Sequence, residues 1–201
     1  MSTLSPFQIY DLLNRPRPLW LVKIDLSGAS LYWVDFSECK LDMANFSRAD
    51  LNWSNFAGAD MRRSDLSMAN LFEAHLQRAN LNEANLSRAN LSKATLIRAN
   101  LNNCILNRAD LSKANLASAN LSGADLSMAN LFDANLVGVN LTGANLVKAD
   151  LTAANLSHAN LSKADLTGAD ITDANLEGAN LEGAIMTDGN VFEPPPVSID
   201  G

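Results

Sequence analysis

Hydrophobic residues recur at every fifth position through most of the chain. Residues 79–93 show the pattern clearly, because a small residue, Asn or Asp, Leu and two variable polar residues follow one another three times. The central apolar residue of this frame falls at every fifth position from Leu26 to Met186, which makes 33 units without an insertion or deletion. An internal repeat of this length indicates a solenoid-like architecture and is interpreted before any other feature.

A period of five excludes the two ordinary patterns of secondary structure. An α-helix turns by about 100° per residue, so that a Leu at every fifth position would not mark one face. In a long flat strand, successive Leu residues would alternate between the two faces, because five is an odd number. Within one unit, however, the small residue and the Leu are two positions apart and can point the same way from a short extended segment.

A turn of about a quarter circle per unit reconciles the period with a buried core. Four units would then close a square coil in which Ala and Leu face the axis and the other positions face outward. Coils stacked at the spacing of neighbouring strands, about 4.8 Å, would form a rod of about eight coils. Asn or Asp before each Leu can hydrogen-bond to nearby backbone groups at a corner, as these side chains do in turns.

Tandem units of the form A(D/N)LXX resemble those of the pentapeptide repeat family, and the resemblance covers residues 24–186. It implies an all-β fold, namely a right-handed quadrilateral β-helix. We expect three segments: an N-terminal helical cap over residues 1–23, the β-helix over residues 24–192 and a proline-rich tail over residues 193–201.

Both ends of the chain depart from the repeat. Ser5 and Pro6 form a typical helix start, and the apolar residues that follow predict a short helix over the N-terminal end of the rod. An open end would otherwise expose core and unpaired strand edges. At the other end, Val191 and Phe192 are expected to lie over the last coil, because the three prolines after them cannot donate ladder hydrogen bonds.

The charge is unevenly distributed. The chain carries a net charge of −7, and residues 164–201 contain eight acidic residues and no Lys or Arg. Residues 1–163 contain 14 acidic and 15 basic residues, a net charge of +1. We therefore expect a nearly neutral rod with an acidic end, which is unsuited to direct binding of nucleic acid.

The two cysteines, Cys39 and Cys104, both occupy the small inward position. They lie more than three coils apart, too far for a disulfide, so we expect buried, reduced thiols. Reduced thiols favour a cytoplasmic location. The N-terminus has no signal-peptide pattern and no stretch is long and apolar enough to span a membrane, so no membrane association is expected.

No residue pattern indicates catalysis. His75 and His158 have no second His, Cys or carboxylate at a metal-ligand spacing, and neither a phosphate-binding loop nor a nucleophile with a base is present. We therefore predict no catalytic residues, no cofactor, no metal and no enzymatic activity.

Two groups of apolar residues are predicted to point outward. Residues twenty apart should stack, which places Tyr32, Trp33, Trp53, Phe72 and Phe132 on one wall. Exposed apolar patches mark contact sites, although the N-terminal helix folding over the first of these residues is an alternative explanation. A second wall carries a column of Ile97, Ala117 and Val137, which would suit a weak homodimer seam or a partner groove.

The sequence thus predicts a rigid, non-enzymatic rod that binds another protein, whose identity it does not specify. The alternative is mimicry of nucleic acid. The family resemblance implies that some members occupy the DNA site of type II topoisomerases such as gyrase. Those members are strongly acidic dimers joined through a C-terminal helix, whereas this chain is near-neutral over residues 1–163 and has prolines where that helix would be.

Overall fold

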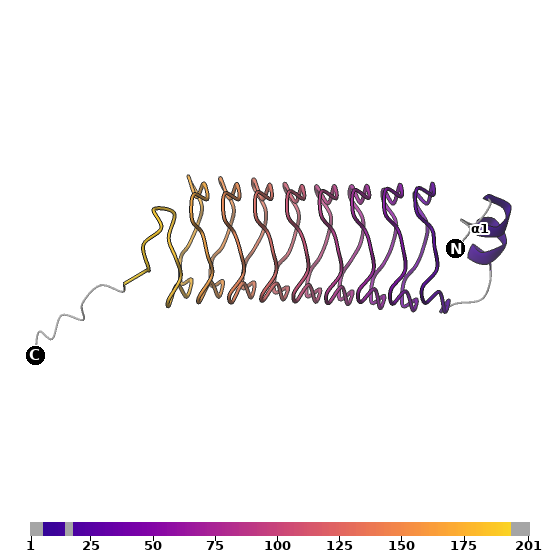
Figure 1. The fold of residues 1–201 in the computed structure, drawn as a ribbon, viewed down its shortest axis with the longest axis horizontal. Helices are drawn as coiled ribbons and strands as arrows, with labels where there is room; N and C mark the ends of the chain where they lie inside the picture. Colours follow the sequence, from indigo (N-terminus) through magenta and orange to yellow (C-terminus); the bar gives the residue numbers. More distant parts are fainter. Residues whose placement is uncertain (1–5, 15–17, 194–201) are drawn as a thin grey trace, which may run out of the picture.

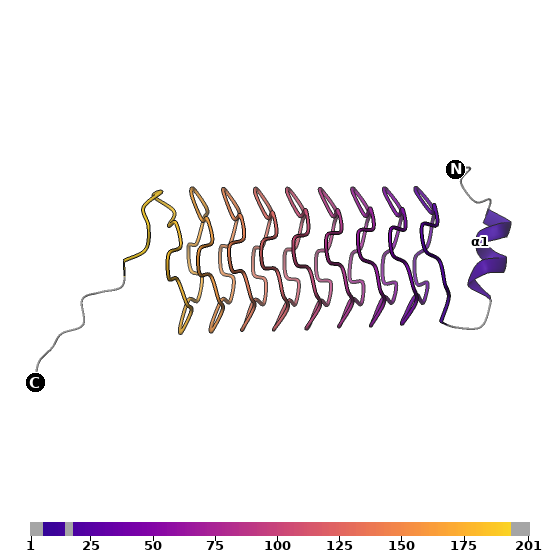
Figure 2. The same ribbon diagram turned by 60° about the horizontal axis from the view of Figure 1, so that its bottom comes forward.

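The computed structural model describes residues 6–14 and 18–193. A short helix, α1 (Pro6–Leu13), precedes a rod of stacked four-sided coils (Figure 1). Helix α1 lies at one end of the rod, and the C-terminal segment leaves from the opposite end (Figures 1 and 2).

The coils are joined by parallel bridges between residues twenty apart. These bridges run without interruption from the pair Trp20 and Lys40 to the pair Asp165 and Ile185. Each unit is joined to the unit stacked on it in the next coil by three backbone hydrogen bonds. In one example, Leu81 N donates to Asn100 O at 2.7 Å, Glu83 N donates to Asn102 O at 3.0 Å, and Asn100 N donates to Ala79 O at 2.9 Å. The ladder therefore satisfies the backbone through contacts between successive coils, as the repeat predicts.

Each corner of the coil is a β-turn. The backbone N–H of the small residue donates to the C=O of the preceding Leu, as Ala84 does to Leu81 at 2.9 Å. The third residue of each turn has a positive φ close to +58°, for example Glu83 at +59° and Arg88 at +58°. A positive φ at this position alone defines a type II turn.

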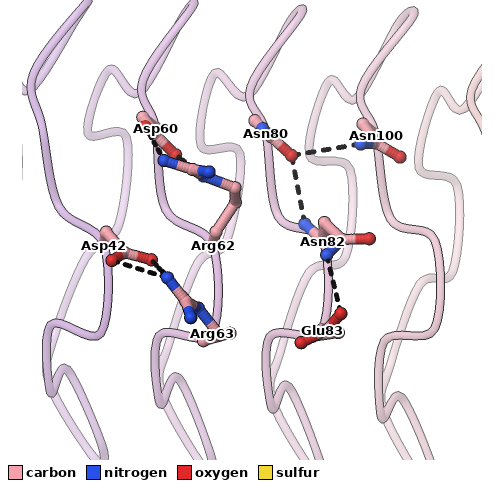
Figure 3. A network of polar contacts seen from close by, with 8 residues as sticks. All are labelled: Asp42, Asp60, Arg62, Arg63, Asn80, Asn82, Glu83 and Asn100. Carbon is pink, nitrogen blue, oxygen red and sulfur yellow. Dashed lines mark hydrogen bonds and ion pairs between the residues drawn. The ribbon is translucent and has the colours of Figure 1, made fainter.

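Asn and Asp before each Leu hold the corners together, as expected. Asn45 Oδ1 accepts a hydrogen bond from the Ser47 backbone N–H at 3.0 Å, and the same contact recurs along the rod. These side chains also bond to each other across the coils, in separate pairs at three of the corners and in a longer ladder at the fourth. Figure 3 shows the first contact of that ladder, in which Asn100 Nδ2 donates to Asn80 Oδ1 at 3.1 Å. The ladder continues through Asn120 and Asn140.

The core is a column of Leu and Ala along the axis, with nearly complete burial from Phe36 to Leu166. Three phenylalanines fill the axis of the N-terminal coils. Phe36 stacks on Phe56 with ring centroids 5.1 Å apart, and Phe46 packs with its edge against both. Stacking of Phe36 on Phe56 confirms the twenty-residue register of the coil.

The ladder begins before residue 24. Leu19 and Leu21 are buried in the core, and Trp20 between them forms the first bridge. The first unit of the rod therefore falls inside the range 1–23 that the sequence assigns to the cap, because its inward positions hold two Leu rather than Ala and Leu. Ahead of this unit, Leu12 of α1 packs against the core.

Candidate interaction surface

Three aromatic side chains form a continuous contact on the outside of the first coils. Trp33 stacks on Trp53 with ring centroids 5.3 Å apart and an angle of 12° between the planes. Trp53 in turn meets Phe72 edge-on at 5.9 Å. We call Trp33, Trp53 and Phe72 the aromatic ladder. Consecutive coils position these residues, since Trp33 and Trp53 occupy the same turn position twenty residues apart.

Two charged residues extend the aromatic ladder toward the middle of the rod. Trp53 Nε1–H donates to Glu73 Oε2 at 3.0 Å, and Lys93 Nζ donates to Glu73 Oε1 at 3.2 Å. The Lys93 ammonium also lies 5.1 Å from the centre of the Phe72 ring, which is a cation–π geometry. The hydrogen bond from Trp53, together with Lys93, lowers the pKa of Glu73. These contacts fix the orientation of Trp53 and Phe72.

Helix α1 does not cover this surface. Trp33 is 68% exposed and the neighbouring Tyr32 is 56% exposed, whereas Trp53 and Phe72 are partly buried against each other and against Glu73 and Lys93. The alternative in which the N-terminal helix shields these residues is therefore wrong for Tyr32 and Trp33. Helix α1 instead contacts the end of the core through Leu12.

The structure separates the other predicted residues from the aromatic ladder. Phe132 lies on the same wall, three coils beyond Phe72, and is 39% exposed. Ile97, Ala117 and Val137 lie on the adjacent wall in three successive coils and are all partly buried. Their carbonyls accept ladder hydrogen bonds from successive coils, so they form a column as predicted.

A polar wall carries most of the described ion pairs (Figure 3). Arg62 donates to both carboxylate oxygens of Asp60, at 2.7 and 2.8 Å, and these hydrogen bonds lower the pKa of Asp60. Arg63 donates to both oxygens of Asp42 at 2.9 Å. Two acidic side chains on this wall, Asp42 and Asp60, are therefore neutralised by neighbouring arginines, whereas Glu83 accepts a hydrogen bond from Asn82.

Sequence analysis did not identify Glu73 and Lys93 as part of the site. The signal was present, because Trp33, Trp53, Glu73 and Lys93 follow each other at intervals of twenty residues. Only the first two of these residues are aromatic, so aromatic character alone does not indicate the two charged members of the column. Within residues 6–14 and 18–193, no cluster of three or more His, Cys, Asp or Glu side chains could hold a metal ion, and no helix is long and apolar enough to cross a membrane.

Comparison with known proteins identifies the family to which this fold belongs. A four-sided coil with one unit per side, type II corners and a Leu–Ala axis is a quadrilateral β-helix. The family model for pentapeptide repeats matches residues 29–67, 69–108, 109–146 and 149–188. The chain belongs to the pentapeptide repeat family, and its rod is the right-handed quadrilateral β-helix that the sequence predicts.

Several solved structures are similar to this chain. HetL, a pentapeptide repeat protein involved in heterocyst differentiation regulation from the cyanobacterium Nostoc sp. strain PCC 7120, is 36% identical; the match covers 86% of this chain and 89% of HetL, with a TM-score of 0.48. QnrB1, a plasmid-mediated fluoroquinolone resistance protein, is 21% identical over 86% of this chain and 92% of QnrB1, with a TM-score of 0.46. Rfr23 from the cyanobacterium Cyanothece 51142 is 28% identical over 69% of this chain and 91% of Rfr23, with a TM-score of 0.32. A comparison with curated proteins gave no significant match.

Proposed function

We propose that this protein is a non-enzymatic rod that binds another protein through the aromatic ladder and Tyr32. The observation that carries the proposal is the stack of Trp33 on Trp53, in which Trp33 stays 68% exposed beside the exposed Tyr32. Buried aromatic side chains dominate the energy of protein interfaces, and Trp and Tyr are the residue types most enriched there.

The support around the aromatic ladder favours binding. Glu73 and Lys93 hold Trp53 and Phe72 in one arrangement before any partner arrives. A surface that is already ordered loses less side-chain entropy on association, so more of the contact energy appears as affinity. The rod places this surface near its N-terminal end, on consecutive coils, so that one partner can contact Tyr32 and all three rings.

The role we propose is binding without catalysis. The axis is filled by buried Leu and Ala, and the side chains that gather on the candidate surface are aromatic rather than acid, base or nucleophile. The two free cysteines are buried, which fits a reducing compartment and supports a cytoplasmic location.

Nucleic-acid mimicry is the weaker alternative. Along the rod, Asp42 and Asp60 pair with arginines and Glu73 pairs with Lys93, so these carboxylates do not form an uncompensated acidic column. A gyrase supercoiling assay separates the two proposals. The interaction rod should leave supercoiling unchanged, whereas inhibition that added DNA relieves would favour mimicry.

The direct test replaces the exposed part of the surface. Tagged protein carrying Tyr32→Ser and Trp33→Ser is expressed in the source organism and compared with the unchanged protein by affinity capture and mass spectrometry. Both side chains are exposed, so the fold should persist while the partner is lost. The matched control carries Met128→Ser and Phe132→Ser, which removes two exposed apolar side chains far from the aromatic ladder.

The control should retain the same partner. Loss of the partner in the control but not in the Tyr32 and Trp33 variant would move the contact to Phe132 and contradict the proposal. Identical captured proteins in all three samples would also contradict it.

A further inference from the structure

The C-terminal end of the rod carries an unpaired β edge. In the preceding unit, Leu166 N donates to Ile185 O at 2.8 Å and Gly168 N donates to Thr187 O at 2.9 Å. The equivalent N–H groups of the following three units make no hydrogen bond within the described part of the chain. They belong to Ile171, Asp173, Leu176, Gly178, Leu181 and Gly183. Unpaired donors of this kind are a template for adding a strand.

The chain itself shows how this edge accepts a strand. After the last coil the backbone folds back, and Val191 forms an antiparallel bridge with Ile185. Phe192 N donates to Ala184 O and Met186 N donates to Asn190 O, each at 2.7 Å. The predicted stopper formed by Val191 and Phe192 is therefore present, but its backbone pairing reaches only one of the four sides, and Val191 stays 60% exposed.

The remaining three sides of the last coil offer the same pair of backbone groups, one N–H donor and one C=O acceptor. In each of them the N–H of the central residue and the C=O of the small residue have no partner among the described residues. The pairs are Ile171 with Ala169, Leu176 with Ala174, and Leu181 with Ala179. Each of these sides can therefore pair with an antiparallel segment in the geometry that Val191 already uses.

One of these sides also has a cavity. A hollow of about 680 Å³ is lined by residues 179–183 together with Val191 and Phe192. Leu181 at its centre is only partly buried, whereas the equivalent Leu161 in the coil below is fully buried. An apolar side chain placed in this cavity would complete the packing that the next coil would otherwise supply.

The rim of the same end is acidic. Glu182 is exposed beside the cavity, and Glu177 and Asp188 are exposed in the neighbouring units. No Lys or Arg follows Lys163 in the chain. These exposed carboxylates belong to the same units as the unpaired N–H groups, or to the unit beside them, so a strand added there would have acids beside its outward side chains. Complementary outward side chains are Lys and Arg.

We propose that this edge binds an extended segment of a partner protein by antiparallel strand addition at residues 179–183. The segment carries an apolar residue that enters the cavity and Lys or Arg residues on either side of it. Backbone hydrogen bonds supply affinity in this mode, and the alternating side chains supply specificity. The site lies at the opposite end of the rod from the aromatic ladder, so it does not depend on the function proposed for that surface.

The test uses the full chain and a short synthetic peptide that alternates Lys with Val. Residue-resolved hydrogen exchange by nuclear magnetic resonance reports the pairing. The Leu181 amide should exchange rapidly in the free protein and become protected when the peptide is added. The amide of Leu81, which occupies the same position in the middle of the rod, should be protected throughout.

The affinity of the labelled peptide, measured by fluorescence anisotropy, tests whether the acidic rim and the apolar cavity contribute to binding. Glu182→Lys should weaken binding about tenfold, which corresponds to about 1.4 kcal/mol. Leu181→Ser should weaken it by removing the floor of the cavity. Glu83→Lys, an equal change of charge on the same wall in the middle of the rod, should leave the affinity unchanged and serves as the control.

Three outcomes would overturn the proposal. Absence of both binding and Leu181 protection would show that the edge does not take this segment. Protection that needs no peptide and increases with protein concentration would assign the edge to a second copy of the chain. Protection that needs no peptide, is independent of concentration and disappears when residues 193–201 are removed would assign the edge to the chain's own tail.

Discussion

One residue in every five of the rod adopts a left-handed backbone conformation. Most of these positions hold a residue with a side chain, such as Arg88 at φ +58° or Lys93 at φ +58°, rather than glycine. The left-handed conformation costs a non-glycine residue about 1–2 kcal/mol. The fold tolerates this cost because the N–H of each such residue joins the ladder and the small residue that follows is buried.

Two neighbouring alanines provide a direct test of the left-handed backbone conformation at the corners. Ala153 has a φ of +57° and is exposed, so Ala153→Gly should stabilise the rod by about 1 kcal/mol. Ala154 is buried in the axis, so Ala154→Gly should destabilise it by about 1 kcal/mol. Urea denaturation followed by circular dichroism measures both changes. Equal destabilisation by the two substitutions would contradict the left-handed corner.

Buried Cys104 should make stability depend on alkaline pH. Its Sγ–H donates to Leu81 O at 2.8 Å, and burial raises the pKa of the thiol to about 12. The folded state therefore holds this proton more tightly than the unfolded state, and the corresponding stability is present below about pH 9 and is lost as the pH rises toward about 12. Denaturation midpoints across this range should fall more steeply for the unchanged protein than for Cys104→Ala. Parallel pH profiles would show that the thiol is not held in this environment.

At the scale of the element, each unit is stable only through its neighbours. A single side of the coil contributes one bridge, one turn and two inward side chains, and its hydrogen bonds go to the coils before and after it. Stability in such an array is a sum over neighbouring units, so the ends are the weak points. Leu12 of helix α1 packs against the core at one end, and the segment 186–192 pairs with one side of the coil at the other.

Removal of residues 1–18 should therefore lower the melting temperature and promote association between rods. The deletion exposes Leu19 and Leu21 together with the edge of the first coil, and this edge is complementary to the unpaired C-terminal edge. Differential scanning calorimetry and sedimentation velocity measure the two effects. Leu12→Ser should reproduce part of the change, whereas Phe7→Ser, at a side chain 78% exposed, should reproduce none. Unchanged melting and sedimentation after the deletion would show that α1 is not a cap.

The repeat made most of the fold predictable from sequence, because a period of five leaves few ways to bury Leu and Ala together. The predicted column of Phe36 and Phe56 is present in the structure, as are the Asn and Asp contacts at the corners. Left-handed corners were not predicted, since Arg, Lys and Met at those positions give no signal for a positive φ. Exposure of Trp33 was also undecided, because the path of α1 depends on the contact of Leu12 with the core rather than on a repeat.

At the scale of the whole molecule, the two ends of the rod differ in chemistry. The N-terminal coils present exposed aromatic side chains, and the C-terminal coil presents unpaired backbone groups within an acidic rim. The outer faces in the middle of the rod are mainly polar, and ion pairs such as Arg63 with Asp42 lie nearer its N-terminal end. A rod with chemically distinct ends can hold two contacts at a fixed separation, as the two proposed binding surfaces require.

Photo-crosslinking from position 33 tests the central claim most directly. A photoreactive aromatic amino acid, which keeps a ring at the position, replaces Trp33 in one sample and Ala153 in another, in cells of the source organism. Both positions belong to the same turn column on the same wall, so they differ mainly in their distance from the aromatic ladder. We predict a specific crosslinked protein from position 33 and none from position 153. No crosslink from position 33, or the same products from both positions, would contradict binding through the aromatic ladder.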